Sequence, residues 1–370
     1  MRADGVRDER DETEGRTGRA PIDDVVDWEL AARTAAAVTR PGPHLSHDEA
    51  SRLVGELRDA ARAAGPYVAE VSRLSAPTGD DAGVLVVDRA GWARVNVRGF
   101  RGLLEPVVAE ATRRREVQPP AVVTAVGGRL TGLEVGGLLG FLSSRVLGQY
   151  DAFARDGHLL LVAPNVLTVE RELQVPPRDF RLWVCLHEET HRAQFGANPW
   201  LAAHLVERIR SLVGDLLLEP AQFAERLARA LRDVPGLVRG EGSGVPLLDA
   251  VQTPEQRAAL AELTAVMSLL EGHADVVMDE VGPKVVPAVD EIRERFTRRR
   301  AGRGAVDRLL RRLLGLEAKM RQYADGARFV REVTAQVGLD GFNAVWRGPE
   351  TLPRAAEIAD PAAWVRRVHG

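Results

Sequence analysis

Two histidines and a glutamate that could hold and use a metal ion stand close together in the middle of the chain. His187, Glu188 and His191 belong to the pentapeptide H-E-E-T-H, which matches the pattern H-E-x-x-H. On a helix, residues four apart lie about 40° apart in projection, with roughly 6 Å between Cβ atoms, so both imidazoles can reach one ion. Zinc accepts imidazole nitrogens and, at a catalytic site, keeps one position for water. Glu188 is then placed to take a proton from that water.

The surrounding segment is typical of the helix that this chemistry needs. Pro176 and Pro177 can open a helix, and Gly196 followed by Pro199 can close it. Between them, apolar and histidine side chains recur at spacings of three and four, which predicts a helix over 178–195 with one inward face: Phe180, Trp183, Val184, His187, His191 and Phe195. The alternative is a pair of hydrogen-bonded core histidines. Because an unpartnered polar ring on that face would be costly, metal binding is the favoured interpretation.

A third protein ligand is needed, and Glu271 is the strongest candidate. The metzincin class would place glycine three residues and histidine six residues after the second histidine, but Gln194 and Ala197 stand there. Glu271 interrupts the apolar stripe of a helix predicted over 254–281. Buried carboxylates are rare unless they are paired or bound to metal. A salt bridge to an arginine is therefore the alternative role for Glu271.

Three further residues could support or replace Glu271. Asp275 lies one turn further on the same helical face, and it could accept the outer N–H of a zinc-bound histidine and so hold that ring in place. His204 lies thirteen residues after the second histidine, on the next predicted helix, and is an alternative third ligand. His273 points about 200° away from Glu271 in helical projection, which favours a surface or supporting role over a shared ion.

Longer strings in the sequence resemble those of a zincin-like family. The H-E-x-x-H helix followed much later by E-x-x-x-D, from Glu271 to Asp275, looks like the gluzincin branch of zinc metallopeptidases. The strings are L-G-Q-Y-D (147–151), L-V-A-P-N (161–165), L-E-G-H-A-D (270–275), L-E-A-K-M-R-Q-Y (316–323) and F-N-A-V-W (342–346). Members of this family are labelled hydrolases or zinc-dependent metalloproteases, some of them associated with deazaflavin-coenzyme biosynthesis. The resemblance covers residues 25–370.

The resemblance implies a zincin-type, largely helical fold and a Zn²⁺ site at His187, His191 and Glu271, with Glu188 catalytic. The chain departs from the best-known gluzincins in two respects. About eighty residues separate the second histidine from Glu271, and Leu270 stands where those enzymes have an asparagine before the ligand glutamate.

The chemistry that these residues favour is metal-assisted hydrolysis of an amide bond, with a peptide or a small amide as substrate. Zinc would polarise the carbonyl group, and Glu188 would move the proton from water to the leaving nitrogen. The oxyanion needs a further donor, for which Tyr323, Arg321 and His204 are candidates and Tyr323 is our selection. Two rival functions use the same residues. One is hydrolysis of a small amide or cofactor precursor, and the other is a non-catalytic, zinc-stabilised helical protein that binds a partner.

The rest of the sequence predicts a mainly α protein with a minor sheet, a helical bundle around the H-E-x-x-H helix. Helical periodicity covers, among other segments, 22–39, 131–153 and 254–281, and the last begins with a Thr-Pro-Glu-Gln capping box. Short strands are predicted at 84–87 and 158–163. The second strand is either an exposed edge that could hold a peptide beside the metal by strand addition or an ordinary buried strand.

The chain has 370 residues and no interior stretch that looks like an interdomain linker. We therefore predict one zincin-like domain over 23–370, with an N-terminal helical subregion over 23–155 and a catalytic region over 156–370. Residues 1–22 carry alternating arginine and acidic side chains with almost no large apolar ones, which predicts a disordered tail. The tail also lacks the apolar core of a secretory signal.

Composition excludes several classes of partner. A formal net charge of −3 argues against general nucleic-acid binding. The most hydrophobic window, 121–147, contains Arg129, Glu134 and Arg145, so a buried helix explains it better than a membrane span. The single cysteine, Cys185, excludes a disulfide framework and reads as a small core residue. We predict a cytoplasmic protein with no nucleic-acid or membrane partner; the oligomeric state does not follow from the sequence.

Overall fold

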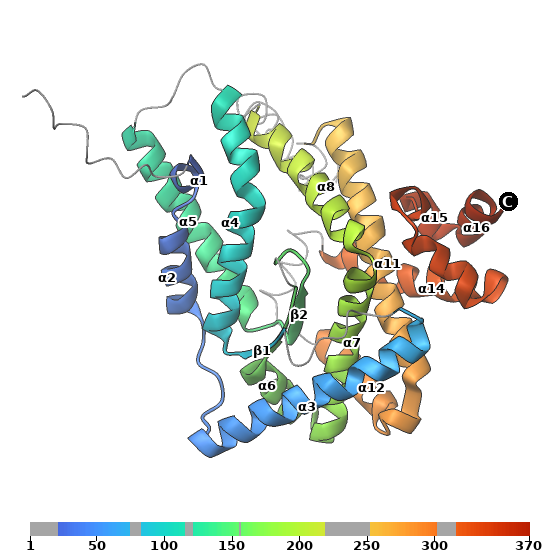
Figure 1. The fold of residues 1–370 in the computed structure, drawn as a ribbon. Coiled ribbons are helices and arrows are strands. Elements are labelled where there is room, and N and C mark those ends of the chain that lie inside the picture. The colour runs from blue at the N-terminus through green and yellow to red at the C-terminus, as the bar shows by residue number, and fades with distance from the viewer. Residues whose placement is uncertain (1–20, 75–82, 115–120, 155–156, 219–251, 302–315) are drawn as a thin grey trace, which may run out of the picture.

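The computed structural model describes residues 21–74, 83–114, 121–154, 157–218, 252–301 and 316–370. These residues form many helices and one small sheet (Figure 1), which confirms the predicted mainly α fold class. The elements are α1 (Pro21–Val25), α2 (Trp28–Val38), α3 (His47–Ser72), β1 (Val84–Val87), α4 (Arg89–Arg114), α5 (Ala121–Ser143), β2 (Gly148–Asp151), β3 (His158–Val162), α6 (Ala163–Leu173), α7 (Pro177–Ala197), α8 (Pro199–Leu218), α11 (Pro254–Val285), α12 (Val289–Ala301), α14 (Leu316–Phe342), η1 (Asn343–Trp346), η2 (Pro349–Thr351), α15 (Ala355–Ala359) and α16 (Pro361–His369).

The predicted tail over 1–22 lies outside the described residues, apart from its last two positions, which belong to α1. The predicted single domain over 23–370 and its two subregions stay predictions. Among the described residues, no helix combines the length and apolar character needed to cross a lipid bilayer.

Several helices begin and end where the sequence offers a local reason. Ser46 and Glu49 form a capping box at the start of α3. The predicted capping box at the start of α11 is confirmed, with Thr253 and Gln256 each accepting from the other's backbone N–H. The axis of α11 breaks at Gly282, where φ is 66°, a conformation that favours glycine. The break coincides with the predicted end of this helix at residue 281. After the break, one further helical turn continues to Val285, the last residue of α11.

The sheet has three strands in the order β1-β3-β2, with β3 parallel to β1 and antiparallel to β2. Both strands predicted from the sequence, at 84–87 and 158–163, are confirmed as β1 and β3. β3 is the central strand, and its residues 159–162 are buried, so the interpretation of this strand as an exposed edge is wrong and the buried-strand alternative is confirmed. In the described sheet, β1 and β2 flank β3 and form the two edges.

The helix predicted over 131–153 ends earlier, because a residue from α6 caps it. The side-chain amide of Asn165 donates to the carbonyl oxygens of Ser143 at 2.7 Å and Val146 at 2.6 Å. These bonds satisfy carbonyl groups at the C-terminus of α5 and turn the chain into β2. The prediction of helix over 148–151 is therefore wrong, since helical periodicity cannot register a bond to a residue twenty positions away.

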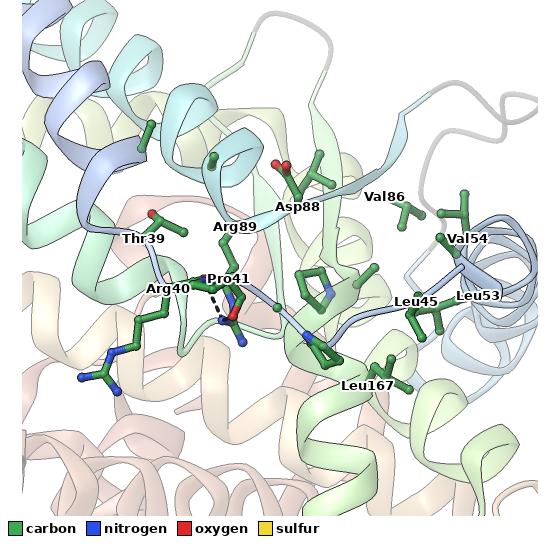
Figure 2. Close-up of a pocket in the computed structure, with 18 residues that line it drawn as sticks. Thr39, Arg40, Pro41, Leu45, Leu53, Val54, Val86, Asp88, Arg89 and Leu167 are labelled. Carbon is green, nitrogen blue, oxygen red and sulfur yellow. Dashed lines mark hydrogen bonds between the residues drawn. The ribbon is translucent and has the colours of Figure 1, made fainter. Parts of the chain in front are cut away.

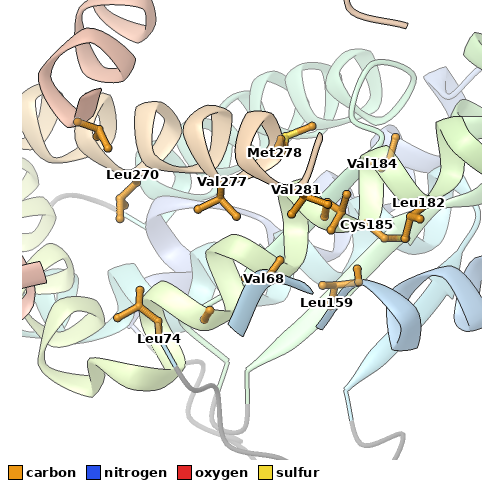
Figure 3. Close-up of a cluster of buried hydrophobic side chains, with 14 of the residues drawn as sticks. Val68, Leu74, Leu159, Leu182, Val184, Cys185, Leu270, Val277, Met278 and Val281 are labelled. Carbon is orange, nitrogen blue, oxygen red and sulfur yellow. The ribbon is translucent and has the colours of Figure 1, made fainter. Parts of the chain in front are cut away.

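The sheet separates two clusters of buried apolar side chains. Alternate residues of β3 enter each cluster, as expected for a strand. Leu159 and Leu161 pack with α3, α7, α11 and α14, whereas Leu160 and Val162 pack with α1, α2, α4 and α5. Figure 3 shows part of the first cluster, with side chains of α7 and α11 beside Leu159. Cys185 is fully buried in this cluster, which confirms it as a small core residue.

On one side of the sheet, α5 approaches α2 so closely that only glycine fits at the contact. Gly132, Gly136 and Gly140 of α5 face the backbone of α2. A Cβ atom at Gly136 would lie 2.5 Å from the carbonyl oxygen of Ala31, closer than real Cβ atoms come. The glycines therefore allow the two helices to pack backbone against backbone.

On the other side of the sheet, α11 and α14 make a similar contact. A Cβ atom at Gly326 of α14 would lie 1.9 Å from the carbonyl oxygen of Ser268, and one at Gly272 of α11 would lie 2.2 Å from the carbonyl carbon of Gly326. One of these two glycine contacts, at Gly272, is thus directly after Glu271 in the sequence.

Candidate metal centre

The H-E-x-x-H motif lies in the middle of α7, which confirms the predicted helix. Pro177 opens this helix, since proline suits a first helical turn. Phe180, Val184 and Leu186 of α7 are buried, and the helix packs against α3. Because the helix is held by this core, the two histidines, one turn apart, are presented together on one side.

The structure brings His187, His191 and Glu271 to one place. The two Nε2 atoms are 3.2 Å apart, and the ring planes are nearly perpendicular, at 89°. The Glu271 carboxylate has one oxygen 3.6 Å from His187 Nε2 and the other 4.0 Å from His191 Nε2. One ligand atom from each residue lies within 4.8 Å of the others, and no second such group occurs among the residues that the structure describes.

This donor set fits a zinc ion. Bonds of about 2.0–2.1 Å at tetrahedral angles place two nitrogen ligands about 3.3 Å apart. The two imidazole Nε2 atoms, at 3.2 Å, already have nearly that separation. Two imidazoles and one carboxylate form a common three-ligand set of catalytic zinc sites, in which a fourth position stays open for water or substrate. His187, His191 and Glu271 are thus the residues that would hold the ion.

Gln194 holds the His191 ring and determines which nitrogen faces the metal position. Its Nε2 donates to the carbonyl oxygen of Leu270 at 2.9 Å, and a carbonyl can only accept, so the amide orientation is fixed. Gln194 Oε1 therefore accepts from His191 Nδ1, also at 2.9 Å. With the proton of a neutral His191 on Nδ1, Nε2 keeps its lone pair for a metal ion.

Glu188 lies beside the metal position and against the edge strand β2. A Cβ atom at Gly148 would be 2.6 Å from Glu188 Cγ and 2.7 Å from Glu188 Oε1, so this glycine makes room for the carboxyl group. Burial raises the pKa of the Glu188 carboxyl well above its usual range, and the negative charges of Glu271 and Glu189 raise it further. A divalent cation at the neighbouring ligands would oppose this shift and favour the carboxylate form.

The two alternative ligands lie elsewhere. His204 on α8 has its Nε2 atom 3.4 Å from Glu262 Oε1 and its ring against Trp200. His273 is buried, and its ring stacks on Phe342 with centroids 5.5 Å apart. Burial lowers the pKa of His273 to about 3, and the nearby His191 contributes to the same shift. Neither histidine belongs to the group that contains Glu271.

His273 is connected to the metal group through Gln194. The amide Nε2 of Gln194 donates to His273 Nδ1 at 2.9 Å as well as to the backbone of α11. A single amide therefore links His191 of α7 to two points on α11. The supporting role that the sequence leaves open for His273 corresponds to this contact.

Asp275 and Tyr323 complete the residues selected from the sequence. Asp275 lies one turn after Glu271 on α11, and its carbonyl oxygen accepts from Arg293 at 3.2 Å. Its role as a partner of a ligand histidine stays a prediction. Tyr323 and Arg321 belong to the first turns of α14, but their side chains lie outside the described residues. Tyr323 as an oxyanion donor also stays a prediction.

Two residues of this site were missed in the sequence. In the sequence, Gln194 indicates only that the metzincin pattern is absent. Its position three residues after His191 nevertheless places it beside the His191 ring on the helix. Gly148 was assigned to a helix, and nothing local marks it as a neighbour of Glu188. The first residue had a usable signal in its spacing, and the second had none.

Comparisons with known proteins cover nearly the whole chain. A family model described as "Zincin-like metallopeptidase" matches residues 26–365. The crystal structure of a "putative hydrolase with a novel fold" from Chloroflexus aurantiacus is similar, with 29% sequence identity and a TM-score of 0.63. That match covers 92% of this chain and 98% of the other. No curated protein matches the chain.

Proposed function

The chain belongs to the zincin-like metallopeptidase family, and from this premise we propose that it is a zinc-dependent peptidase with Glu188 as its general base. The observation that carries the proposal is the convergence of His187, His191 and Glu271 next to a buried glutamate. Three ligands leave an open position on a tetrahedral ion, as catalysis requires.

The ligand residues and Glu188 divide the chemistry between them. A zinc ion bound in this position would be a Lewis acid that polarises the scissile carbonyl group and lowers the pKa of bound water. His187 and His191 contribute neutral nitrogens, and Glu271 contributes negative charge from α11. Glu188 accepts the proton of the attacking water and transfers it to the leaving nitrogen, which turns a poor leaving group into an amine. Tyr323 of α14 is the proposed donor to the oxyanion.

The edge strand β2 supports a peptide as the substrate. β2 pairs with β3 on one side, and in the described part of the chain no strand pairs with its other side. An extended peptide can add to such an edge through backbone hydrogen bonds, which are tolerant of sequence. Because Gly148 of β2 touches Glu188, a peptide bound along this strand would pass beside the general base.

Replacing the base tests the proposal. Glu188→Gln keeps the shape of the side chain but cannot accept the proton, so turnover should fall by at least about 10²-fold while stoichiometric zinc is retained. Hydrolysis of a peptide library by zinc-loaded protein, followed by mass spectrometry, measures the first effect, and elemental analysis measures the second. Glu70→Gln, an exposed change on α3, is the matched control and should hydrolyse like the unmodified protein.

The outcomes separate the rival functions. Persistent peptide hydrolysis by Glu188→Gln would contradict the assignment of the base. Zinc binding without hydrolysis of any library peptide by the unmodified protein would contradict the peptidase and leave the two rivals, a hydrolase of a small amide or cofactor precursor and a zinc-stabilised binding protein. Absence of stoichiometric metal from the purified protein would contradict the metal centre as a whole.

A further inference from the structure

A cavity that none of the metal-centre residues line has four arginines among its described lining residues. It has a volume of about 560 Å³ and lies among the end of α2 and the helices α4, α5, α6 and α12. Arg40, Arg89, Arg145 and Arg299 line it, and Glu172 is the one acidic residue among the described residues of its wall. None of the residues of the metal centre takes part. We refer to it as the arginine cavity.

Arg89 is a buried guanidinium that the protein holds in place without neutralising. Its Nε donates to Asn165 Oδ1 at 2.6 Å, and its Nη1 donates to the carbonyl oxygens of Arg40 at 2.9 Å and Pro41 at 2.8 Å. Within the described part of the chain, no carboxylate lies within ion-pair distance of Arg89, and its Nη2 atom has no hydrogen-bond partner. Burying a charge without a counter-charge is costly, so an anion from solution would lower that cost.

The other arginines are arranged around the same cavity. The guanidinium of Arg145 lies 3.4 Å above the ring of Phe141. The Nη1 atom of Arg145 also donates to the backbone carbonyl oxygen of Phe141. Arg299 is paired with Glu172 at 2.5 Å, which offsets one of the four positive charges. Arg40 is exposed and makes no side-chain bond to the described residues. Arg89 and Arg40 therefore contribute positive charge that no carboxylate among the described residues offsets.

Arg40 and Arg89 also line a neighbouring cavity of about 520 Å³, whose wall is mainly apolar. Figure 2 shows this mainly apolar cavity, with Leu45, Leu53 and Leu167 on one side. In the same view, the side chain of Arg40 extends away from these leucines. The Arg40 side chain is thus directed away from the apolar wall.

We propose that the arginine cavity is a binding site for a phosphoryl group, either inorganic phosphate or a phosphate monoester. Guanidinium groups present planar pairs of donors that match phosphate oxygens. A phosphoryl group has three terminal oxygens and so can accept from the guanidinium groups of both Arg89 and Arg40. A single carboxylate offers two oxygens and would leave this charge less well matched.

Binding measurements on the full zinc-loaded protein test this site. Isothermal titration with inorganic phosphate and with phenyl phosphate, at constant ionic strength, should show saturable binding of at least one of them. Arg40→Ala removes an exposed side chain with no partner in the described chain, so the fold should persist and phosphate affinity should fall about tenfold. Arg33→Ala, an exposed position on α2 that pairs with Glu29, is the matched control and should bind like the unmodified protein.

Each result has one meaning for the proposal. Tighter binding of phenyl phosphate than of phosphate assigns the monoester, and the reverse assigns the free ion. Absence of saturable binding, binding of succinate but of neither phosphate, or an equal loss in Arg40→Ala and Arg33→Ala would each overturn it. Neither arginine touches the metal ligands, so a phosphate ion bound at the zinc would be unaffected by Arg40→Ala. The proposal does not depend on peptide hydrolysis.

Discussion

Helices pack closely through glycines on both sides of the sheet, but only one of the two contacts lies beside the candidate metal ligands. On one side, glycines of α5 meet the backbone of α2, and on the other, glycines of α11 and α14 meet each other (Figure 1). The contact between α2 and α5 is surrounded by apolar and small side chains such as Trp28, Ala31 and Leu139. The contact between α11 and α14 lies next to Glu271 and His273. Close helix packing therefore stabilises both halves, but only in one does it set distances between reactive groups.

Three consecutive residues of α11 show how this works. Glu271 points to the histidines of α7, Gly272 meets α14, and His273 contacts Gln194 and Phe342. Successive helical residues are rotated by about 100°, so each of these contacts constrains the other two. The position of Glu271 is consequently tied to the separation of α11 from α14. We expect substitutions on this side to change metal affinity together with stability, and those on the other side to change stability alone.

The largest effect is expected from Gly326→Ala. The new Cβ atom would overlap the carbonyl oxygen of Ser268, and backbone must move because no flexible side chain can yield. The free energy of unfolding should fall by at least about 3 kcal/mol. Zinc affinity should fall as well, because α11 carries Glu271. Urea denaturation of the metal-free protein and competition with a chromophoric chelator measure the two effects; a loss of stability with unchanged zinc affinity would contradict the coupling.

Gly136→Ala tests the opposite side of the sheet. Its Cβ atom would press on the backbone of α2 at Ala31, so the free energy of unfolding should fall by about 1–3 kcal/mol. Zinc affinity should stay the same, because neither helix contributes a ligand. Gly55→Ala is the control: a Cβ atom there meets nothing within 4 Å, and the helix should gain about 0.5–1 kcal/mol. If Gly136→Ala weakened zinc binding, the two sides would not be independent.

A smaller effect is expected from Gln194→Leu, measured on metal affinity. The substitution removes the acceptor that fixes the His191 ring, and losses of such outer partners typically weaken metal binding by about 10–100-fold. Ser143→Ala removes a buried hydroxyl between α2 and α5 and should leave zinc affinity unchanged. Equal zinc affinity in Gln194→Leu and the unmodified protein would show that Gln194 is only a packing residue.

The sequence predicts which three side chains converge, because most of the signals are local. His187, Glu188 and His191 lie within five residues, and Glu271 is recognisable as a carboxylate in an apolar stripe. The helix that carries each of them was predicted from periodicity and its terminal residues, and the structure has both helices. The spacing of two ligands on one turn leaves few alternatives.

The parts that the sequence does not predict depend on contacts between distant residues. β2 follows from the bonds of Asn165 to the end of α5, and α6 begins directly after β3, where the sequence shows only an apolar run ending in Pro164. The arginine cavity combines positions 40, 89, 145 and 299 from separate elements. Such groupings exist only after the helices have packed, so neither periodicity nor motif spacing can indicate them.

The absence of a side chain at Gly148 makes the position of the Glu188 carboxyl sensitive to how the edge strand aligns with its neighbour. If β2 slid by one position along β3, the side chain of Gln149 would arrive where the glutamate now sits. The alignment of β2 on β3 thus decides whether the Glu188 carboxyl has room, and an error in that alignment would displace this side chain.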